Sequence, residues 1–303
     1  MTTASAASVR SVVVERIGVY VALTKPRIIE LLLVTTLPGM VLAAGGWPSW
    51  PILLVTMVGG ACAAGAASVL NCIYDRDIDA VMTRTQSRPL VTGAVSVRAA
   101  WVFAGVLSVI SIGLLAVGAT PLAGAMAAAS IAWYGFLYTR VLKRHTRHST
   151  ILGGVPGAAP VLIGYAAVAG TASISAVVFF AVVFCWQMPH FWSLATKYRD
   201  DYARAGIPML PVVMPVRGVA LRSLLWAYAT VAVSLILPLV DDRIGGFYLV
   251  AAAAGGLGLL IHAHGFLRRA CVDPAGSRPM LLFHTSVAYM CLLPIGIMVD
   301  VLL

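Results

Sequence analysis

The chain has 303 residues, of which 60% are hydrophobic and only 11% are charged, and its mean hydropathy is +0.94. Soluble domains are about half apolar and about a quarter charged, so this composition excludes an ordinary soluble protein. A net charge of +10 would suggest nucleic acid in a soluble protein. Here the cations lie in short segments between apolar runs, where they orient a chain in a bilayer. We therefore predict a membrane protein without a nucleic-acid partner.

Nine apolar segments are long enough to cross a bilayer. Each is predicted to be a helix, because a helix satisfies its own backbone hydrogen bonds in lipid. Turn signals such as Gly45-Gly46-Trp47-Pro48 separate neighbouring segments. The predicted spans cover about residues 28–46, 51–72, 99–117, 121–138, 152–169, 174–195, 219–239, 245–266 and 280–299.

The predicted fold is all-α, a polytopic membrane protein. Residues 1–27 are expected to be a cytoplasmic N-terminal tail, followed by one transmembrane domain over residues 28–303. Polar clusters follow the second and the sixth span, four helices apart, which favours two parallel four-helix halves. The halves would cover about residues 28–150 and 151–266 around a central cavity, and an extra helix would follow at about 280–299.

The basic residues predict the orientation. Twenty of the 21 Lys and Arg residues lie on one side of the predicted spans, and only Arg243 lies on the other. By the positive-inside rule the N-terminus is cytoplasmic, and nine spans place the C-terminus outside. The sequence thus predicts a multi-pass protein of the cell (inner) membrane, with both acidic clusters on the cytoplasmic side.

The stretch NCIYDRDIDAVMTRTQSRPL, residues 71–90, places three aspartates directly after an apolar span. Asn71, Asp75 and Asp79 are spaced by four residues and share one helix face. Asp77 points to the opposite side. Carboxylates four residues apart repel each other unless a cation lies between them, and Mg²⁺ prefers such oxygen ligands together with substrate phosphate oxygens. The pattern predicts a Mg²⁺ site for a phosphorylated substrate.

Cations border both acidic clusters and suit the oxygens of a diphosphate. An acidic, cation-lined rim beside an apolar cavity fits a long hydrocarbon that carries a diphosphate. The alternative is that these side chains only end helices and extend into lipid headgroups. The candidate diphosphate ligands are Arg84, Arg88, Lys143, Arg144, Lys197 and Arg199.

The NxxxDxxxD pattern after a helix, with a second polar cluster in a later repeat, resembles the UbiA superfamily of intramembrane prenyltransferases. The likeness runs from about LTKPRI (23–28) through the last helix, and YTRVLKRHTRHSTILGGVPGAAPVLIGYAAVAG belongs to it. The first pattern specifies only the superfamily. The stretch WQMPHFWSLATKYRDDYARAGIPMLPVV is more specific and is similar to the branch that modifies heme.

This resemblance implies Mg²⁺-dependent transfer of a farnesyl group from farnesyl diphosphate to a vinyl group of heme b, which gives heme O. Asp75 and Asp79 would hold Mg²⁺ with help from Asn71. Heme A synthase or cytochrome oxidase assembly factors would be downstream partners. The residues that the resemblance makes catalytic are Asn71, Asp75, Asp79 and Asp201.

The second cluster departs from the spaced acidic pair that is common in the superfamily. Asp200 and Asp201 are adjacent and cannot face the same way on a helix. Both are candidate ligands for a second Mg²⁺; we favour Asp201, and expect the other carboxylate to pair with Arg199 or Lys197.

His190 lies after a proline within an apolar helix. An ionisable residue inside a membrane is functional by default, and an imidazole can ligate heme iron or hold a propionate. The alternative is that it satisfies carbonyls freed by Pro189. Tyr138, Trp192 and Tyr198 are further candidates for prenyl or heme contact, and the alternative for such aromatics is core packing or the interfacial belt.

Two other functions fit parts of the pattern. The first is a prenyltransferase of the same superfamily that acts on a quinone precursor such as 4-hydroxybenzoate. The second is a transporter of heme or polyprenyl phosphate. Transporters place charges near the middle of the membrane in broken helices. The aspartates here cluster at one rim, which favours an enzyme.

Overall fold

The computed structural model describes residues 6–303, with side chains from residue 15 onward. Over these residues the secondary structure is helical, without strands. Nine segments are long and apolar enough to cross a membrane, which confirms the nine predicted spans. They comprise α2 (Pro26–Ala44), α3 (Trp50–Tyr74), α5 (Val97–Gly118), α6 (Pro121–Ala132) with π-helix η1 (Trp133–Leu142) and α7 (Lys143–His145), α8 (Ser149–Leu152) with α9 (Gly154–Ala169), α10 (Ile174–Lys197), α13 (Val216–Ser234) with α14 (Leu237–Val240), α15 (Gly246–Val272) and α16 (Pro279–Leu302).

Local signals explain where these helices begin. Proline occupies the first helical position of α2, α6 and α16, where its missing N–H is not needed. Side chains cap three starts, that of α6 among them: the hydroxyls of Ser96, Thr120 and Ser173 each accept a backbone N–H three residues ahead. The spans therefore start at the turn signals that separate the apolar runs.

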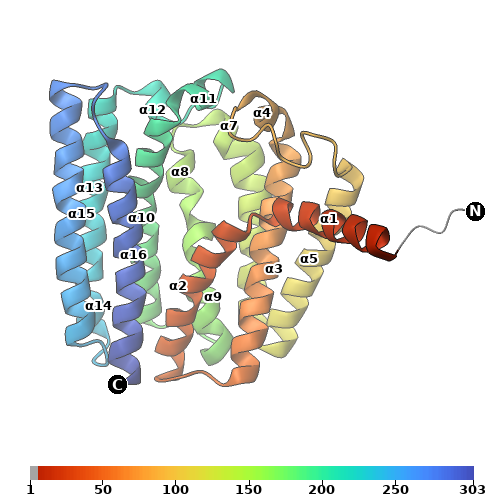
Figure 1. Cartoon of the computed structure of the whole chain (residues 1–303). Helices are drawn as coiled ribbons and strands as arrows, with labels where there is room; N and C mark the ends of the chain where they lie inside the picture. The colour runs from red at the N-terminus through yellow and green to blue at the C-terminus, as the bar shows by residue number, and fades with distance from the viewer. Residues whose placement is uncertain (1–5) are drawn as a thin grey trace, which may run out of the picture.

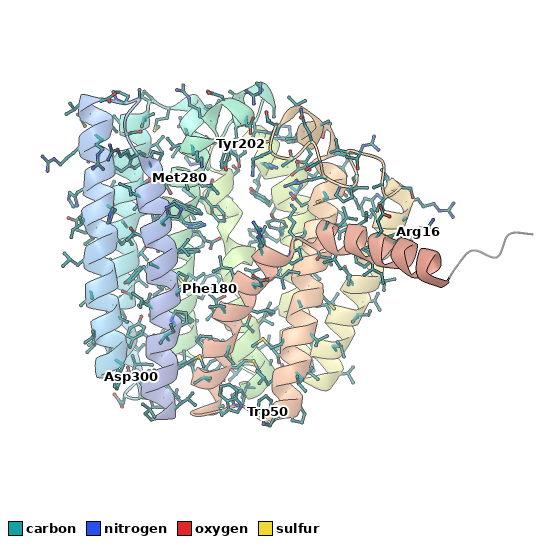
Figure 2. All side chains as sticks on the ribbon, in the orientation of Figure 1. Arg16, Trp50, Phe180, Tyr202, Met280 and Asp300 are labelled. Atoms are coloured by element: carbon teal, nitrogen blue, oxygen red, sulfur yellow. The ribbon has the colours of Figure 1, made fainter. Side chains whose placement is uncertain are left out.

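Short helices gather at one end of the bundle. In Figure 1, α4 (Arg76–Val81), α7, α11 (Arg199–Arg204) and α12 (Leu210–Val213) lie at the top, and α14 and the C-terminus lie at the bottom. Figure 2 shows Tyr202 and Met280 near the upper end and Trp50 and Asp300 near the lower one. The polar segments that follow the second and sixth spans therefore lie at the same end of the molecule.

The segment expected as an N-terminal tail contains a helix, α1 (Ala6–Thr24). Figure 1 shows it lying across the bundle rather than along it. Leu23, at its C-terminal end, is fully buried in an apolar cluster that also includes residues of α3, α5 and α6. Residues 1–5, and the side chain of Arg10, lie outside the described part.

Buried apolar residues form two large clusters. One joins α1, α3, α5 and α6, and the other joins α10, α13, α15 and α16. Helix α9 contributes to both, through Ile163 and Ala166 to the first and through Ala158 and Val161 to the second. The division into halves near residue 150 stays a prediction, since α9 packs continuously across it.

Helices α2 and α9 approach each other unusually closely. A Cβ at Gly39 would collide with the carbonyl oxygen of Val161, and one at Gly164 with the carbonyl oxygen of Thr36. Small residues let membrane helices approach until their backbones touch. This contact fixes α2, and with it the connection to α1, against the middle of the bundle.

Candidate active site

The Asn71–Asp75–Asp79 face is buried at the C-terminal end of α3. Helix α3 ends at Tyr74 and α4 begins at Arg76, yet the backbone hydrogen bonds continue in step: Asp75 N–H to Asn71 O at 2.9 Å and Asp79 N–H to Asp75 O at 2.7 Å. The three side chains therefore keep one face. They are 4%, 0% and 2% exposed, so two carboxylates lie out of water a single turn apart.

A cation neutralises each carboxylate. Lys143 Nζ lies 2.5 Å from Asp75 Oδ2, and Arg88 Nη1 lies 2.5 Å from Asp79 Oδ2. Burial opposes the charge on Arg88, but Asp79 outweighs it and the pKa of Arg88 is raised. Buried charges persist when they are paired. The cluster is thus a closed arrangement of opposite charges at the end of an apolar bundle.

Lys25 joins this cluster, although it was not among the predicted site residues. Its Nζ donates to Asn71 Oδ1 at 2.5 Å, and burial lowers the pKa of this lysine. Its backbone is left-handed, with φ 56°, a conformation that costs energy in a residue with a side chain. The feature of the sequence that could have pointed to Lys25 is its position directly before Pro26, between α1 and α2.

The π-helix η1 presents the next wall of the site. Thr139 Oγ1 donates to the Tyr134 carbonyl at 2.8 Å and lies 3.2 Å from Asn71 Nδ2. The amide of Asn71 also donates to Asp75 Oδ2 at 2.8 Å. Tyr134 and Tyr138 stack with their ring centroids 5.1 Å apart. Wide π-turns are rare and often occur at functional sites, and this one brings both rings and Thr139 to the same region.

Asp77 points away from this face, as the spacing predicts. Its side chain is 66% exposed and forms two hydrogen bonds, of 2.7 and 2.8 Å, with Arg144. These bonds lower the pKa of Asp77. Arg144 also donates to the Tyr74 carbonyl at 2.5 Å, so it holds the end of α3 and does not reach Asp75 or Asp79 by any described hydrogen bond.

The segment after the sixth span packs against the loop after α4. Arg84 donates to the Tyr202 hydroxyl at 2.9 Å and lies over the rings of Tyr198 and Tyr202, 5.3 and 5.2 Å from their centroids. Beneath these contacts lies an apolar cluster formed by Ile78, Met82, Ala195, Ile207 and Met209. The two polar segments therefore form one continuous rim.

The side chains of the adjacent residues Asp200 and Asp201 lie in different environments, as their spacing requires: Asp200 is exposed and Asp201 is buried. Asp201 is buried and pairs with Arg204, which also donates to Thr83 at 3.0 Å. The partner of Asp201 is thus Arg204, and no described ion pair joins Asp200 to Lys197 or Arg199. Instead, those three residues line a separate cavity of about 710 Å³ beside the start of α16.

His190 is buried between two aromatic rings. Its ring stacks on Trp186 and Phe283, with centroids 4.4 and 4.5 Å away. The Ser286 hydroxyl donates to the Phe283 carbonyl at 2.6 Å, so it accepts from His190 Nδ1, 3.0 Å away. In a neutral ring the proton is then on Nδ1, and Nε2 keeps its lone pair. No described hydrogen bond links the ring to a carbonyl near Pro189.

Trp192 lies in a different environment from His190. It is 2% exposed and packs with Met188, Leu210 and Val219 at the junction of α10, α12 and α13. This position supports core packing for Trp192. Tyr138 and Tyr198, by contrast, border the polar rim through Tyr134 and Arg84, respectively.

The donor set fits Mg²⁺ with a substrate phosphate. The described residues contain no group of three or more His, Cys, Asp or Glu side chains that would hold an ion alone. Mg²⁺ commonly needs only one or two carboxylates, and it completes its coordination with water and phosphate oxygens. Asp75 Oδ1 is a buried oxygen without a hydrogen-bond partner in the described structure. An unsatisfied buried carboxylate oxygen is the atom that such an ion would satisfy.

Comparison with known proteins agrees with this geometry. Residues 32–287 match the UbiA prenyltransferase family. Protoheme IX farnesyltransferase 1 of Saccharopolyspora erythraea is 50% identical over 284 residues, which cover 94% of this chain and 90% of that one. The protoheme IX farnesyltransferase of Salinispora tropica is 50% identical over 287 residues, covering 95% and 89%.

Solved structures share the fold at low sequence identity. A structure from a study of digeranylgeranylglyceryl phosphate synthase has a TM-score of 0.78 at 17% identity and covers 95% of this chain and 99% of its own. A UbiA homologue from Archaeoglobus fulgidus bound to GPP and Mg²⁺ has a TM-score of 0.67 at 16% identity, covering 93% and 99%. The chain is therefore an enzyme of the UbiA prenyltransferase family, within its group of protoheme IX farnesyltransferases.

Proposed function

We propose that this enzyme transfers the farnesyl group of farnesyl diphosphate to a vinyl group of heme b, with Mg²⁺ at Asp75 and Asp79. The observation that carries the proposal is the buried pair of carboxylates surrounded by Lys25, Arg88 and Lys143. The names of the relatives support heme as the acceptor. The GPP and Mg²⁺ bound by the Archaeoglobus protein support the donor class and the metal.

The cations are placed to take over the charge of the diphosphate. When bound, Mg²⁺ supplies positive charge that stabilises the leaving diphosphate. Lys143 and Arg88 now face carboxylate oxygens, and both can turn to phosphate oxygens once the carboxylates have another cation. Lys25 adds a third positive charge from the joint between α1 and α2. Donors held in place before the reaction stabilise the developing charge without having to reorganise.

The apolar side of the site would accommodate the reacting carbons. The farnesyl C–O bond breaks as its electron pair leaves with the diphosphate, and the terminal vinyl carbon forms the new C–C bond. Water then adds to the cation left on the neighbouring carbon and loses a proton, which gives the hydroxyalkyl side chain. The stacked rings of Tyr134 and Tyr138 suit a passing carbocation through their π-faces.

His190 is proposed to hold the acceptor through the iron. A metal-ligating histidine almost always donates its other ring N–H to an acceptor, as His190 does to Ser286. The free lone pair on Nε2 is then the iron ligand. The aromatic rings of Trp186 and Phe283 fix the plane of the imidazole.

We further propose that this site faces the cytoplasm. The short polar helices share one end of the bundle with the basic loops after the second, fourth, sixth and eighth spans, and that end is expected to be cytoplasmic.

The test is to incubate the purified protein with farnesyl diphosphate, Mg²⁺ and heme b and to analyse the pigment by mass spectrometry. The expected product has the mass of heme b plus a farnesyl group and a hydroxyl group. A parallel reaction with 4-hydroxybenzoate tests the other acceptor class. Prenylated hydroxybenzoate with unchanged heme would contradict the proposal.

A further inference from the structure

A cavity of about 710 Å³ opens at the polar end of the bundle, beside the start of α16. It lies between the end of α10, the start of α13 and the loop from α15 to α16. Met280, which lines it, is labelled near the upper end of the molecule in Figure 2, the end that also holds Tyr202. The cavity is separate from the Asn71–Asp75–Asp79 face, because none of those residues lines it.

The walls of this cavity carry an excess of positive charge. Lys197, Arg199 and Arg278 line it, against the single carboxylate of Asp200. None of these four forms an ion pair among the described residues, whereas both buried carboxylates of the other site are paired. A concave, net positive surface attracts anions. The cavity is therefore suited to an anionic group.

A chain of aromatic contacts connects the cavity to His190. His284 lines the cavity and lies edge-on to Phe283, with ring centroids 5.4 Å apart. Phe283 in turn stacks on His190. Along α10, Lys197 lies seven positions after His190, a rise of about 10 Å. A flat ligand held at its centre by His190 would thus have its edge near the cations.

This arrangement matches the chemistry of a porphyrin that carries two carboxylate side chains on one edge. We propose that Lys197, Arg199 and Arg278 bind the propionate carboxylates of the heme acceptor, with the macrocycle extending along the seam between α10 and α16 toward His190. This inference rests on heme being the acceptor. It also separates the two anionic substrates: the diphosphate binds beside Asp75 and Asp79, and the carboxylates bind across the rim in the second cavity.

The test compares heme b with its dimethyl ester, in which both carboxylates are masked. Binding to wild type and to the double variant Lys197→Ala/Arg199→Ala is measured by optical titration, in detergent without anionic lipid. Wild type is expected to bind heme b about tenfold more tightly than the ester, because charged hydrogen bonds are lost with esterification. The double variant should bind heme b about as weakly as the ester and lose no further affinity for the ester.

Two controls separate the possible failures. The matched variant Arg268→Ala/Arg269→Ala removes the same charge from the end of α15, outside this cavity, and should keep the preference for heme b. Lys197 and Arg199 were expected as diphosphate ligands, but they line this second cavity and not the Asn71–Asp75–Asp79 face. The affinity for farnesyl diphosphate should therefore not change in Lys197→Ala/Arg199→Ala. Equal affinity of wild type for heme b and its ester, while heme b is still farnesylated, would overturn the carboxylate site and leave the function standing. Failure of wild type to farnesylate heme b at all would overturn the proposed function itself.

Discussion

Asp75 is the most confined charge of the candidate active site. Its side chain is fully buried, with Lys143 and Asn71 on one oxygen and no described partner on the other. A carboxylate in this position is costly unless charge or metal satisfies it. Two residues further on, Asp77 has the same chemistry in an exposed place. The two aspartates therefore allow a comparison in which only location differs.

Asp75→Asn is expected to reduce kcat/KM at least about 100-fold, since the proposed metal ligand and the partner of Lys143 lose their charge. Asp77→Asn should stay within a few-fold of wild type. Turnover of heme b is measured at saturating Mg²⁺, and thermal unfolding in detergent checks that both variants fold. Similar activity of folded Asp75→Asn and wild type would remove this carboxylate from the reaction.

The lowered pKa of Lys25 leads us to expect that diphosphate binding depends on pH. Burial lowers its pKa from the ordinary 10.5, and a bound anion would raise it again. Binding therefore takes up a proton where Lys25 is partly neutral, and the affinity falls as the pH rises through its pKa. The affinity for a non-reactive thio analogue of farnesyl diphosphate, measured from pH 7 upward, should show this loss in wild type.

Lys25→Met is the control for that titration, because the ligand has ionisations of its own. The variant should bind about tenfold more weakly at pH 7, the scale of one charged hydrogen bond, and the difference from wild type should shrink at high pH. A difference that stays constant with pH would assign Lys25 a purely structural role.

The residues of the site differ in how well the sequence predicts them. The spacing of Asn71, Asp75 and Asp79 fixes a shared face because adjacent helical turns repeat the same geometry. Lys25 and Thr139 meet Asn71 from 46 and 68 residues away. Such contacts depend on how whole helices cross, and nothing local encodes them. The separation of Asp200 from Asp201 followed from their adjacency, but the choice of Arg204 as partner did not.

At the scale of helices, the close crossing of α2 with α9 fixes the position of α2, and Lys25 lies directly before the first residue of α2. The two backbones touch at Gly39 and Gly164, where side chains are excluded. Association in a bilayer depends on such close packing, because lipid tails offer no hydrophobic driving force. The crossing is thus expected to be sensitive to a single methyl group.

Gly164→Ala should destabilise the folded protein by about 1–3 kcal/mol, because its Cβ would collide with the backbone at Thr36. Gly105→Ala is the matched control, since nothing lies within 4 Å of a Cβ at that position in α5. It should be neutral or stabilising by roughly 0.5–1 kcal/mol, the helix preference of alanine over glycine. Thermal unfolding in one detergent compares them. An equal effect of both substitutions would contradict the packing argument.

The spans were predictable because each needs only an uninterrupted apolar run. Helix α1 was not predicted as a helix, because its apolar and charged residues are mixed and its place depends on α3. The π-turns of η1 were not predictable either. In η1 the Thr139 hydroxyl donates a hydrogen bond to the Tyr134 carbonyl, and the Tyr138 ring packs against Gly153, directly before α9. The second contact involves a residue 15 positions further along the chain, so the local sequence does not encode it.

At the scale of the whole molecule, charge is distributed along the membrane normal. The basic loops after the second, fourth, sixth and eighth spans share one end with the short polar helices, and Arg243 lies in the loop at the other end, paired with Asp241 at 2.8 Å. The sequence order of charged segments was enough to predict this distribution. It could not predict the second cavity, because Lys197 and Arg278 are distant in the chain and come together only through the packing of α10 on α16.

Single-cysteine variants test the orientation. Cys271 is exposed at the end of α15, on the side expected to be cytoplasmic, and Asp242→Cys would place a thiol in the exposed loop at the other end. A membrane-impermeant maleimide should label Cys271 only in inside-out vesicles and Asp242→Cys only in intact cells. The reverse pattern would invert the proposed topology.

The pairing of Asp75 with Lys143 and of Asp79 with Arg88 has a consequence for the life of the protein before it meets any substrate. Each carboxylate of the resting site already has a cationic side chain as its partner, so membrane insertion and maturation need neither metal nor pyrophosphate. When the donor arrives, Lys143 and Arg88 exchange carboxylate oxygens for phosphate oxygens. A chelator should therefore abolish activity without unfolding the protein.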